Sequence, residues 1–187
     1  MDQNILDISE KEKRKIRGAG IGMIFQDAGA SLCPIRTIGE QIYESMRAHT
    51  KITRSEAKSR AMDLFDKLNF KDSQRVWDSY PFELSGGMNQ RAGIAIAMLM
   101  NPPILFADEP TSALDVSVQR QVVREMLKLR ELFGTAIVLV THDIGVVRAM
   151  ADTVLVLKNG KTIEYGTADR VLNHPQDPYT RKLLEAV

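Results

Sequence analysis

The sequence has one cysteine, few aromatic residues, almost no net charge and no long apolar run. A single cysteine, Cys33, cannot form an internal disulfide and suits a reducing compartment. A net charge of +1, without a strongly basic segment, argues against nucleic acid as a main partner. We expect no signal peptide, and no apolar stretch approaches the roughly 20 residues of a membrane span. If the protein serves a membrane, it is expected to do so as a peripheral subunit.

The sequence also lacks the phosphate-binding motif G-x-x-x-x-G-K-[ST], whose backbone N–H groups and lysine cradle nucleotide phosphates. Its one Gly-Lys-Thr begins at Gly160, and Leu155 stands where the first glycine of the motif would be. Apolar residues alternate on both sides of Asn159-Gly160, a pattern that predicts a β-hairpin with a type I′ turn. This Gly-Lys-Thr is therefore expected to lie in a hairpin and to bind no phosphate.

Two segments do indicate phosphate chemistry. Residues 104–107 are apolar and run into Asp108-Glu109, which predicts a short buried parallel strand that delivers two carboxylates to the sheet's C-terminal edge. The first acid can hold Mg²⁺, and the second can polarise an attacking water. Upstream, the Ser-Gly-Gly at residues 85–87 predicts a helix start whose free N–H groups favour an anion. The structural alternative is a capped surface helix followed by an ordinary core strand.

The pattern of elements predicts an α/β fold. Apolar strands are expected at residues 21–25, 104–107 and 136–140, and they alternate with helices, which favours a parallel sheet with right-handed crossovers. A helical interval interrupts this alternation and indicates an inserted subdomain, with capping boxes at Thr37 and Thr53. Loops or polar connections are expected at residues 27–34 and 71–80. The predicted division is residues 1–36, 37–101 and 102–187.

Three further polar residues stand next to predicted strands or helices. Gln26 follows the first strand, so its amide can bridge a metal–water shell to a mobile subdomain; a lone glutamine is otherwise a surface residue. His142 follows residues 137–141 and precedes Asp143, although lone histidines are more often structural. Asp115 precedes the helix expected at residues 116–133 and is also a good N-cap.

In this order and spacing, the segments resemble the motifs of ABC-transporter ATPases: the Q-loop (residues 24–27), the signature (84–91), Walker B (104–109), the D-loop (112–115) and the switch histidine. The resemblance implies ATP and Mg²⁺ as ligands, and a dimer in which each signature closes over the nucleotide of the other cassette. It assigns catalytic roles to Glu109, His142 and Gln26, nucleotide binding to Ser85, Gly86, Gly87, Gln90 and Asp115, and the metal to Asp108 and Gln26.

Over nearly its whole length the chain is most similar to the ATP-binding subunits of oligopeptide, dipeptide and nickel importers, including Thr37–Ile42 and the segment from His174 to Thr180. This resemblance implies a second cassette and integral membrane permeases as partners, at the cytoplasmic face of the cell membrane. Ala28, Cys33 and Asn89 depart from the residues usual in that group. Because Walker A is absent, we expect the chain to be the C-terminal part of a longer subunit, inactive by itself.

Two other functions stay open from the sequence. A soluble ABC-type ATPase that is not attached to a transporter is one, although tandem cassettes, long charged linkers and coiled-coil insertions are absent from this sequence. A non-catalytic interaction module is the other, because the phosphate loop is missing. The transported solute cannot be read from this chain, since binding proteins and permeases select it.

Overall fold

The computed structural model describes residues 4–185, in two compact units that meet in the chain between Val140 and Thr141. Within the described range, no helix has both the length and the apolar character that crossing a membrane requires. The first unit contains α1 (Glu10–Ile16), β1 (Ile21–Ile24), α2 (Ala28–Ser31), α3 (Ile38–Arg47), α4 (Arg54–Lys67), α5 (Ser73–Asp78), the 3₁₀ turn η1 (Pro81–Glu83), α6 (Gly86–Met98), β2 (Ile104–Asp108), α7 (Val116–Phe133) and β3 (Ala136–Val140).

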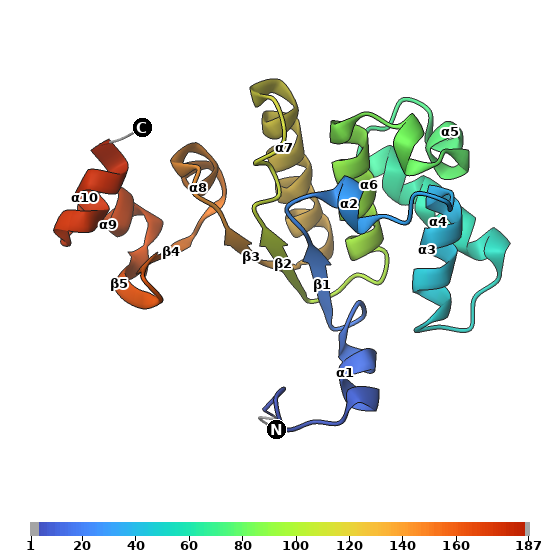
Figure 1. The fold of residues 1–187 in the computed structure, drawn as a ribbon, viewed down its shortest axis with the longest axis horizontal. Coiled ribbons are helices and arrows are strands. Elements are labelled where there is room, and N and C mark those ends of the chain that lie inside the picture. Colours follow the sequence, from blue (N-terminus) through green and yellow to red (C-terminus); the bar gives the residue numbers. More distant parts are fainter. Residues whose placement is uncertain (1–3, 186–187) are drawn as a thin grey trace. The chain divides into compact units, whose positions relative to one another are not determined.

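The three strands of the first unit form a parallel sheet in the order β1-β2-β3 (Figure 1). Ile24 of β1 is paired with Ala107 of β2, and Asp108 is paired with Val140 of β3. The long connections between these strands carry the helices, as parallel pairing requires. The predicted α/β class, with a parallel sheet and an inserted helical part, is confirmed.

Within the first unit the sheet is buried on one face only, so the short buried strand expected at residues 104–107 is buried on one side and exposed on the other. Leu105 and Ala107 of β2 are each 1% exposed, and α6 packs against β1. On the opposite face, Met23, Phe106 and Val138 form a row across the three strands and are 49%, 39% and 44% exposed. The apolar runs are typical of strands buried on both faces, but among the described residues of the first unit no layer covers the second face.

The helical part has its own core, and its caps follow the sequence. The capping boxes at Thr37 and Thr53 are both present, and Ser85 caps α6 by accepting from the Met88 N–H. Apolar side chains from α3, α4 and α6 fill the interior, among them Ile38, Ile42, Met46, Phe65, Ile94 and Met98.

Two expected connections contain helices instead. Residues 27–34 include the one-turn helix α2, because the Asp27 side chain accepts from the Ala30 N–H and caps it. Residues 71–80 include α5, capped by Asp72. Trp77 of α5 is 3% exposed and packs against Gly39 of α3. A Cβ on Gly39 would lie 2.4 Å from Trp77 Cε2, so only glycine fits at that position.

The second unit contains α8 (Ile144–Met150), β4 (Thr153–Lys158), β5 (Lys161–Thr167), α9 (Ala168–Asn173) and α10 (Pro178–Glu185). β4 and β5 are antiparallel, and both Asn159 and Gly160 have positive φ, at 50° and 72°. The hairpin and its type I′ turn are therefore confirmed. Glu164 of β5 accepts from the N–H groups of Gln176 and Asp177, and the first of these contributes most to lowering the pKa of Glu164.

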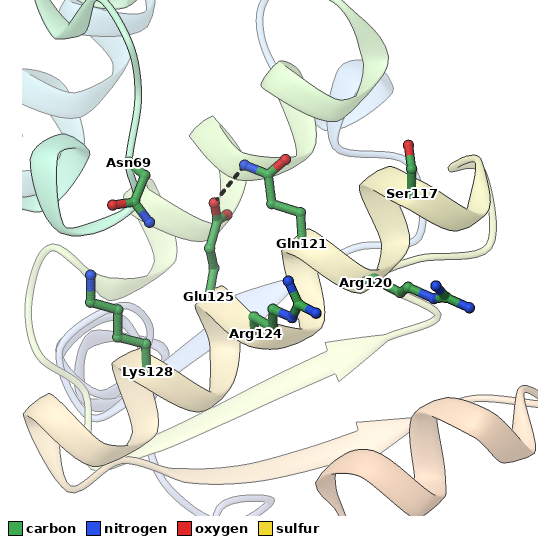
Figure 2. A pocket seen from close by; sticks show the side chains of 7 residues that line it. All are labelled: Asn69, Ser117, Arg120, Gln121, Arg124, Glu125 and Lys128. Atoms are coloured by element: carbon green, nitrogen blue, oxygen red, sulfur yellow. Dashed lines mark hydrogen bonds between the residues drawn. The ribbon is translucent and has the colours of Figure 1, made fainter.

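A buried ion pair joins α6 to α7. Arg91 Nε lies 2.9 Å from Glu125 Oε2, the Arg91 guanidinium also donates to the Leu68 carbonyl, and it stacks 4.1 Å from the Phe70 ring centroid. Figure 2 shows Gln121 donating to the other oxygen of Glu125, at 3.0 Å. Burial raises the pKa of the Glu125 carboxyl, while Arg91 and Gln121 act in the opposite direction.

Removing one charge of this pair is expected to destabilise the chain. Glu125→Leu leaves the Arg91 guanidinium buried without a counter-charge, which costs about 3 to 5 kcal/mol of unfolding free energy. The double variant with Arg91→Met removes both charges and is expected to recover much of that loss. Urea unfolding followed by circular dichroism measures both.

The exposed Arg120→Met on α7 is the control, and its unfolding free energy is expected to stay within about 0.5 kcal/mol of wild type. If Glu125→Leu is as stable as this control, the buried pair does not hold α6 to α7.

Candidate functional site

The C-terminal edge of the parallel sheet carries three of the predicted site residues. Gln26 lies two residues beyond the end of β1, and Asp108 ends the neighbouring strand β2, followed by Glu109. The β1–β2 register places Ile24 beside Ala107, so Gln26 and Asp108 leave the sheet at the same edge. Both are exposed. This is the place where ligands bind in open α/β sheets.

Glu109 has an unusual backbone conformation. Its φ is +45°, in the left-handed region that a residue with an ordinary side chain occupies at a cost of about 1 kcal/mol or more. Among the other residues described, positive φ occurs only at glycines and at Asn69, Asn101 and Asn159, which tolerate it. A hydrogen bond of 2.9 Å from the Glu109 N–H to the Val140 carbonyl of β3 holds this conformation. The chain therefore turns sharply after Asp108, and strain of this kind is concentrated at functional sites.

The loop after Glu109 leads into α7. The Ser112 hydroxyl and N–H both donate to the Glu109 carbonyl, at 3.1 and 3.2 Å. Asp115 then caps α7, because its side chain accepts from the N–H groups of Ser117 and Val118, each at 3.0 Å. The Ser117 hydroxyl is the largest cause lowering the pKa of Asp115. The capping role is present, and contact of Asp115 with a second cassette stays a prediction.

The two glycines of the signature have different surroundings. Gly86 is exposed, and an added Cβ would meet no atom within 4 Å, so its backbone is open to a ligand. A Cβ on Gly87 would lie 2.5 Å from Val118 Cγ1, so Gly87 lets α6 approach the first turn of α7. Ser85 caps α6 and is itself exposed. The start of α6 thus presents free N–H groups next to the capped start of α7.

Gln90 is buried within the same cassette. Its side chain is 4% exposed, and its Oε1 accepts from the Ala28 N–H of α2 at 3.4 Å. Its expected contact with nucleotide stays a prediction. No local sequence pattern predicts this contact, because the two residues are 62 positions apart.

His142 lies in the second unit, two residues beyond the end of β3. Asp143, which follows it, caps α8 by accepting from the Val146 N–H at 3.1 Å. The structure groups Gln26, Asp108 and Glu109 at the sheet edge of the first unit, and the expected approach of His142 to them stays a prediction.

The residues at the sheet edge fit a magnesium ion that is shared with phosphate. Mg²⁺ binds through one or two protein oxygens and keeps water or phosphate oxygens as its other ligands. Asp108 and Gln26 offer a carboxylate and an amide oxygen from adjacent strands. Residues 4–185 contain no group of three or more His, Cys, Asp or Glu side chains that could hold a metal by themselves.

A groove of about 940 Å³ is lined by the N-terminal segment with α1, by β1 and by the helical part. Its lining includes Ile24, Leu32, Gln41, Gly93 and Ala97, so it is largely apolar and borders the segment that follows Gln26. A second groove, of about 540 Å³, lies on α7 and Asn69; Figure 2 shows Arg120, Arg124 and Lys128 at its rim. Sequence patterns alone indicated neither groove.

Comparisons with known proteins agree with this arrangement. A family model described as ABC transporter matches residues 2–112. The dipeptide transport ATP-binding protein DppD of Lactococcus lactis subsp. cremoris is 45% identical over 186 residues, which are 99% of this chain and 53% of that protein. The probable peptide ABC transporter ATP-binding protein y4tR of Sinorhizobium fredii is 41% identical over 99% of this chain and 55% of its own length. The chain thus spans about half the length of these relatives.

Solved structures share the fold. The bacterial ABC transporter cassette MJ0796, solved as a dimer, matches with a TM-score of 0.75 and 32% identity, over 88% of this chain and 69% of that chain. Its post-hydrolysis dimer bound to ADP and Pi matches with a TM-score of 0.74, over 87% of this chain and 68% of that chain. The family match covers more than half of the sequence and the sheet edge carries the corresponding residues, so the chain belongs to the ABC transporter family of ATP-binding cassettes.

Proposed function

We propose that this chain is part of an ATP-binding subunit that powers the import of peptides or a related small solute. The observation that carries the proposal is the sheet edge. There Gln26 follows β1, Asp108 ends the adjacent β2, and the backbone of Glu109 is left-handed. Relatives named for peptide and dipeptide transport support the solute class. The subunit would act at the cytoplasmic face of the cell membrane, paired with a second cassette and bound to integral membrane permeases.

Each residue has a distinct role in the proposed hydrolysis of ATP. Asp108 and Gln26 would hold Mg²⁺, which neutralises phosphate charge when it is bound. Glu109 would orient the attacking water and accept its proton, and the hydrogen bond from its N–H to Val140 fixes the backbone from which its carboxylate extends. The exposed N–H groups at Ser85 and Gly86 would bind the nucleotide of the opposite cassette, and His142 would contact the γ-phosphate.

The apolar groove beside β1 supports the permease as a partner. It borders residues 27–35, the one short connection between the sheet edge and α3. A docking element placed there would contact both the helical part and the segment that follows Gln26.

Transport by a completed cassette tests the whole proposal. The completed cassette is the present chain preceded by the phosphate-loop segment of the Lactococcus lactis relative. It is assembled with that relative's permease in vesicles. ATP-dependent dipeptide uptake is expected, and ATP hydrolysis without uptake of peptides contradicts the proposed function.

The missing G-x-x-x-x-G-K-[ST] motif favours a second function for the chain by itself, that of a non-catalytic interaction module. The present chain is expected to bind ATP weakly and to hydrolyse it at the background rate, because the absent loop supplies most phosphate contacts. Isothermal calorimetry with Mg²⁺-ATP measures the affinity. A dissociation constant in the low micromolar range contradicts the expectation.

In the completed cassette, Glu109→Gln is expected to lower kcat for ATP hydrolysis by about 100-fold or more, because the amide cannot accept a proton. ATP binding is expected to persist, so the loss falls on the chemical step. Glu131→Gln, on the exposed side of α7, is the control and should leave kcat unchanged. A Glu109→Gln variant that turns over at the wild-type rate would exclude Glu109 as the base.

The two signature glycines are expected to differ when each is changed to alanine. Gly86→Ala meets no neighbouring atom, so it should leave unfolding unchanged while slowing ATP hydrolysis by the completed cassette. Gly87→Ala places its Cβ against Val118 and is expected to cost about 1 to 3 kcal/mol of unfolding free energy.

Val118→Ala combined with Gly87→Ala removes the clashing methyl groups and should restore part of the stability. Urea unfolding of the present chain measures these effects. Equal destabilisation by Gly86→Ala and Gly87→Ala would contradict the assignment of Gly86 to ligand contact and Gly87 to packing.

A further inference from the structure

The one-turn helix α2 is packed tightly against the signature helix α6 (Figure 1). Ala28, its first residue, is 3% exposed and donates its N–H to Gln90 Oε1. A Cβ on Gly93 would lie 3.0 Å from Ala28 Cβ, so the two helices meet at a position where α6 has no side chain. Ala28, Gln90 and Gly93 form a contact that we call the α2 latch.

A second glutamine holds the remainder of the same segment. Gln41 of α3 accepts from the Cys33 N–H at 2.8 Å and donates to the carbonyls of Cys33 and Arg36, each at 3.1 Å. Within the described residues, no hydrogen bond joins residues 25–36 to β2 or β3. The segment after Gln26 is therefore fastened to the helical part, and Gln26 lies in the short covalent link between that segment and the sheet.

Gln90 and the preceding Asn89, whose amide donates to the Pro81 carbonyl, each carry one buried polar atom without a hydrogen-bond partner among the described residues. Gln90 Nε2 and Asn89 Oδ1 make no hydrogen bond, and the Ala28–Gln90 bond is long at 3.4 Å. A buried donor or acceptor that is left unpaired is unfavourable, and such groups are uncommon in folded proteins. Both side chains come from successive residues of α6, and Asn89 Nδ2 lies 3.8 Å from where a Cβ on Gly29 of α2 would stand.

We propose that Gln90 is a positioning residue, which fixes the segment after Gln26 to the signature helix so that a partner docking on that segment moves residues 85–87 with it. The inference rests on the proposed function, because it specifies how permease docking reaches the nucleotide contact of α6. A ligand or partner shifts a conformational equilibrium only through contacts that differ between the two states. The α2 latch supplies such a contact between the docking segment and the start of α6.

Hydrogen exchange on the present chain tests the latch without any catalytic activity. Gln90→Ala is expected to speed exchange of the Ala28 amide by about tenfold, the factor that one lost hydrogen bond supports. Gln41→Ala is the matched control and should speed exchange at Cys33 while leaving Ala28 unchanged. Exchange at Ala28 that Gln90→Ala leaves unchanged overturns the proposal.

The number of peptide molecules transported per ATP hydrolysed, which we call the transport ratio, measures the coupling in the completed cassette. Gly93→Ala favours helix formation in α6, so a loss cannot come from a weakened helix. It should push α2 away and lower the transport ratio severalfold. Ala28→Gly removes the opposing Cβ and is expected to restore the ratio in the double variant. Gln90→Ala should lower the same ratio.

The outcomes separate the latch from the proposed function. A wild-type completed cassette that hydrolyses ATP without moving peptide overturns the proposed function, while the exchange experiment still decides whether the latch exists. Wild-type transport with a ratio that Gly93→Ala leaves intact overturns the coupling role. A raised KM for ATP in Gln90→Ala, with an unchanged ratio, assigns Gln90 to nucleotide contact and also overturns it.

Discussion

The buried guanidinium of Arg91 is the contact on which the arrangement of α6 and α7 depends. It reaches the Glu125 carboxylate, the Leu68 carbonyl at the end of α4 and the face of Phe70. A charge in such a place is tolerable only when its donors are satisfied, so the neighbouring elements must keep their positions for the pair to persist. The same two helices meet again at their N-termini through Gly87 and Val118. The free N–H groups at the start of α6 therefore lie close to the capped start of α7.

The half-covered sheet places the candidate metal ligand on an unusual surface. Asp108 follows Phe106 by two residues, so both side chains lie on the same exposed face of β2. An apolar face of this kind is normally covered in an α/β fold. Covering it would also exclude water from the surroundings of Asp108, and a carboxylate in such surroundings interacts more strongly with a cation. A cover on this face is therefore expected to strengthen the binding of Mg²⁺ at Asp108.

Local chemistry made the helices and the hairpin predictable. Thr37, Thr53 and Asp115 each satisfy the free N–H groups of the helix that follows, and Asn159-Gly160 suits the positive φ of a type I′ turn. The sheet edge could be predicted for a similar reason, since parallel strands bring their polar ends together. The short helices α2 and α5 were missed because tertiary contacts stabilise them: Trp77 needs the bare backbone at Gly39, and Ala28 needs Gln90. The exposure of one sheet face was not predicted, because an apolar strand has the same sequence pattern whether or not a second layer covers it.

Ala28 of α2 meets Asn89 and Gly93 of α6 at the α2–α6 contact, although position 28 is far from both in the sequence. Ala28 and Asn89 are two of the three positions where the sequence departs from the importer group that it resembles. Alanine at the first position of α2 keeps an N–H for Gln90 that proline would lack, and glycine on α6 leaves the space for alanine's methyl group. The contact therefore depends on the N–H of Ala28 and on the absence of a side chain at Gly93. Together they allow a close approach between the segment that follows Gln26 and the helix that begins after Ser85.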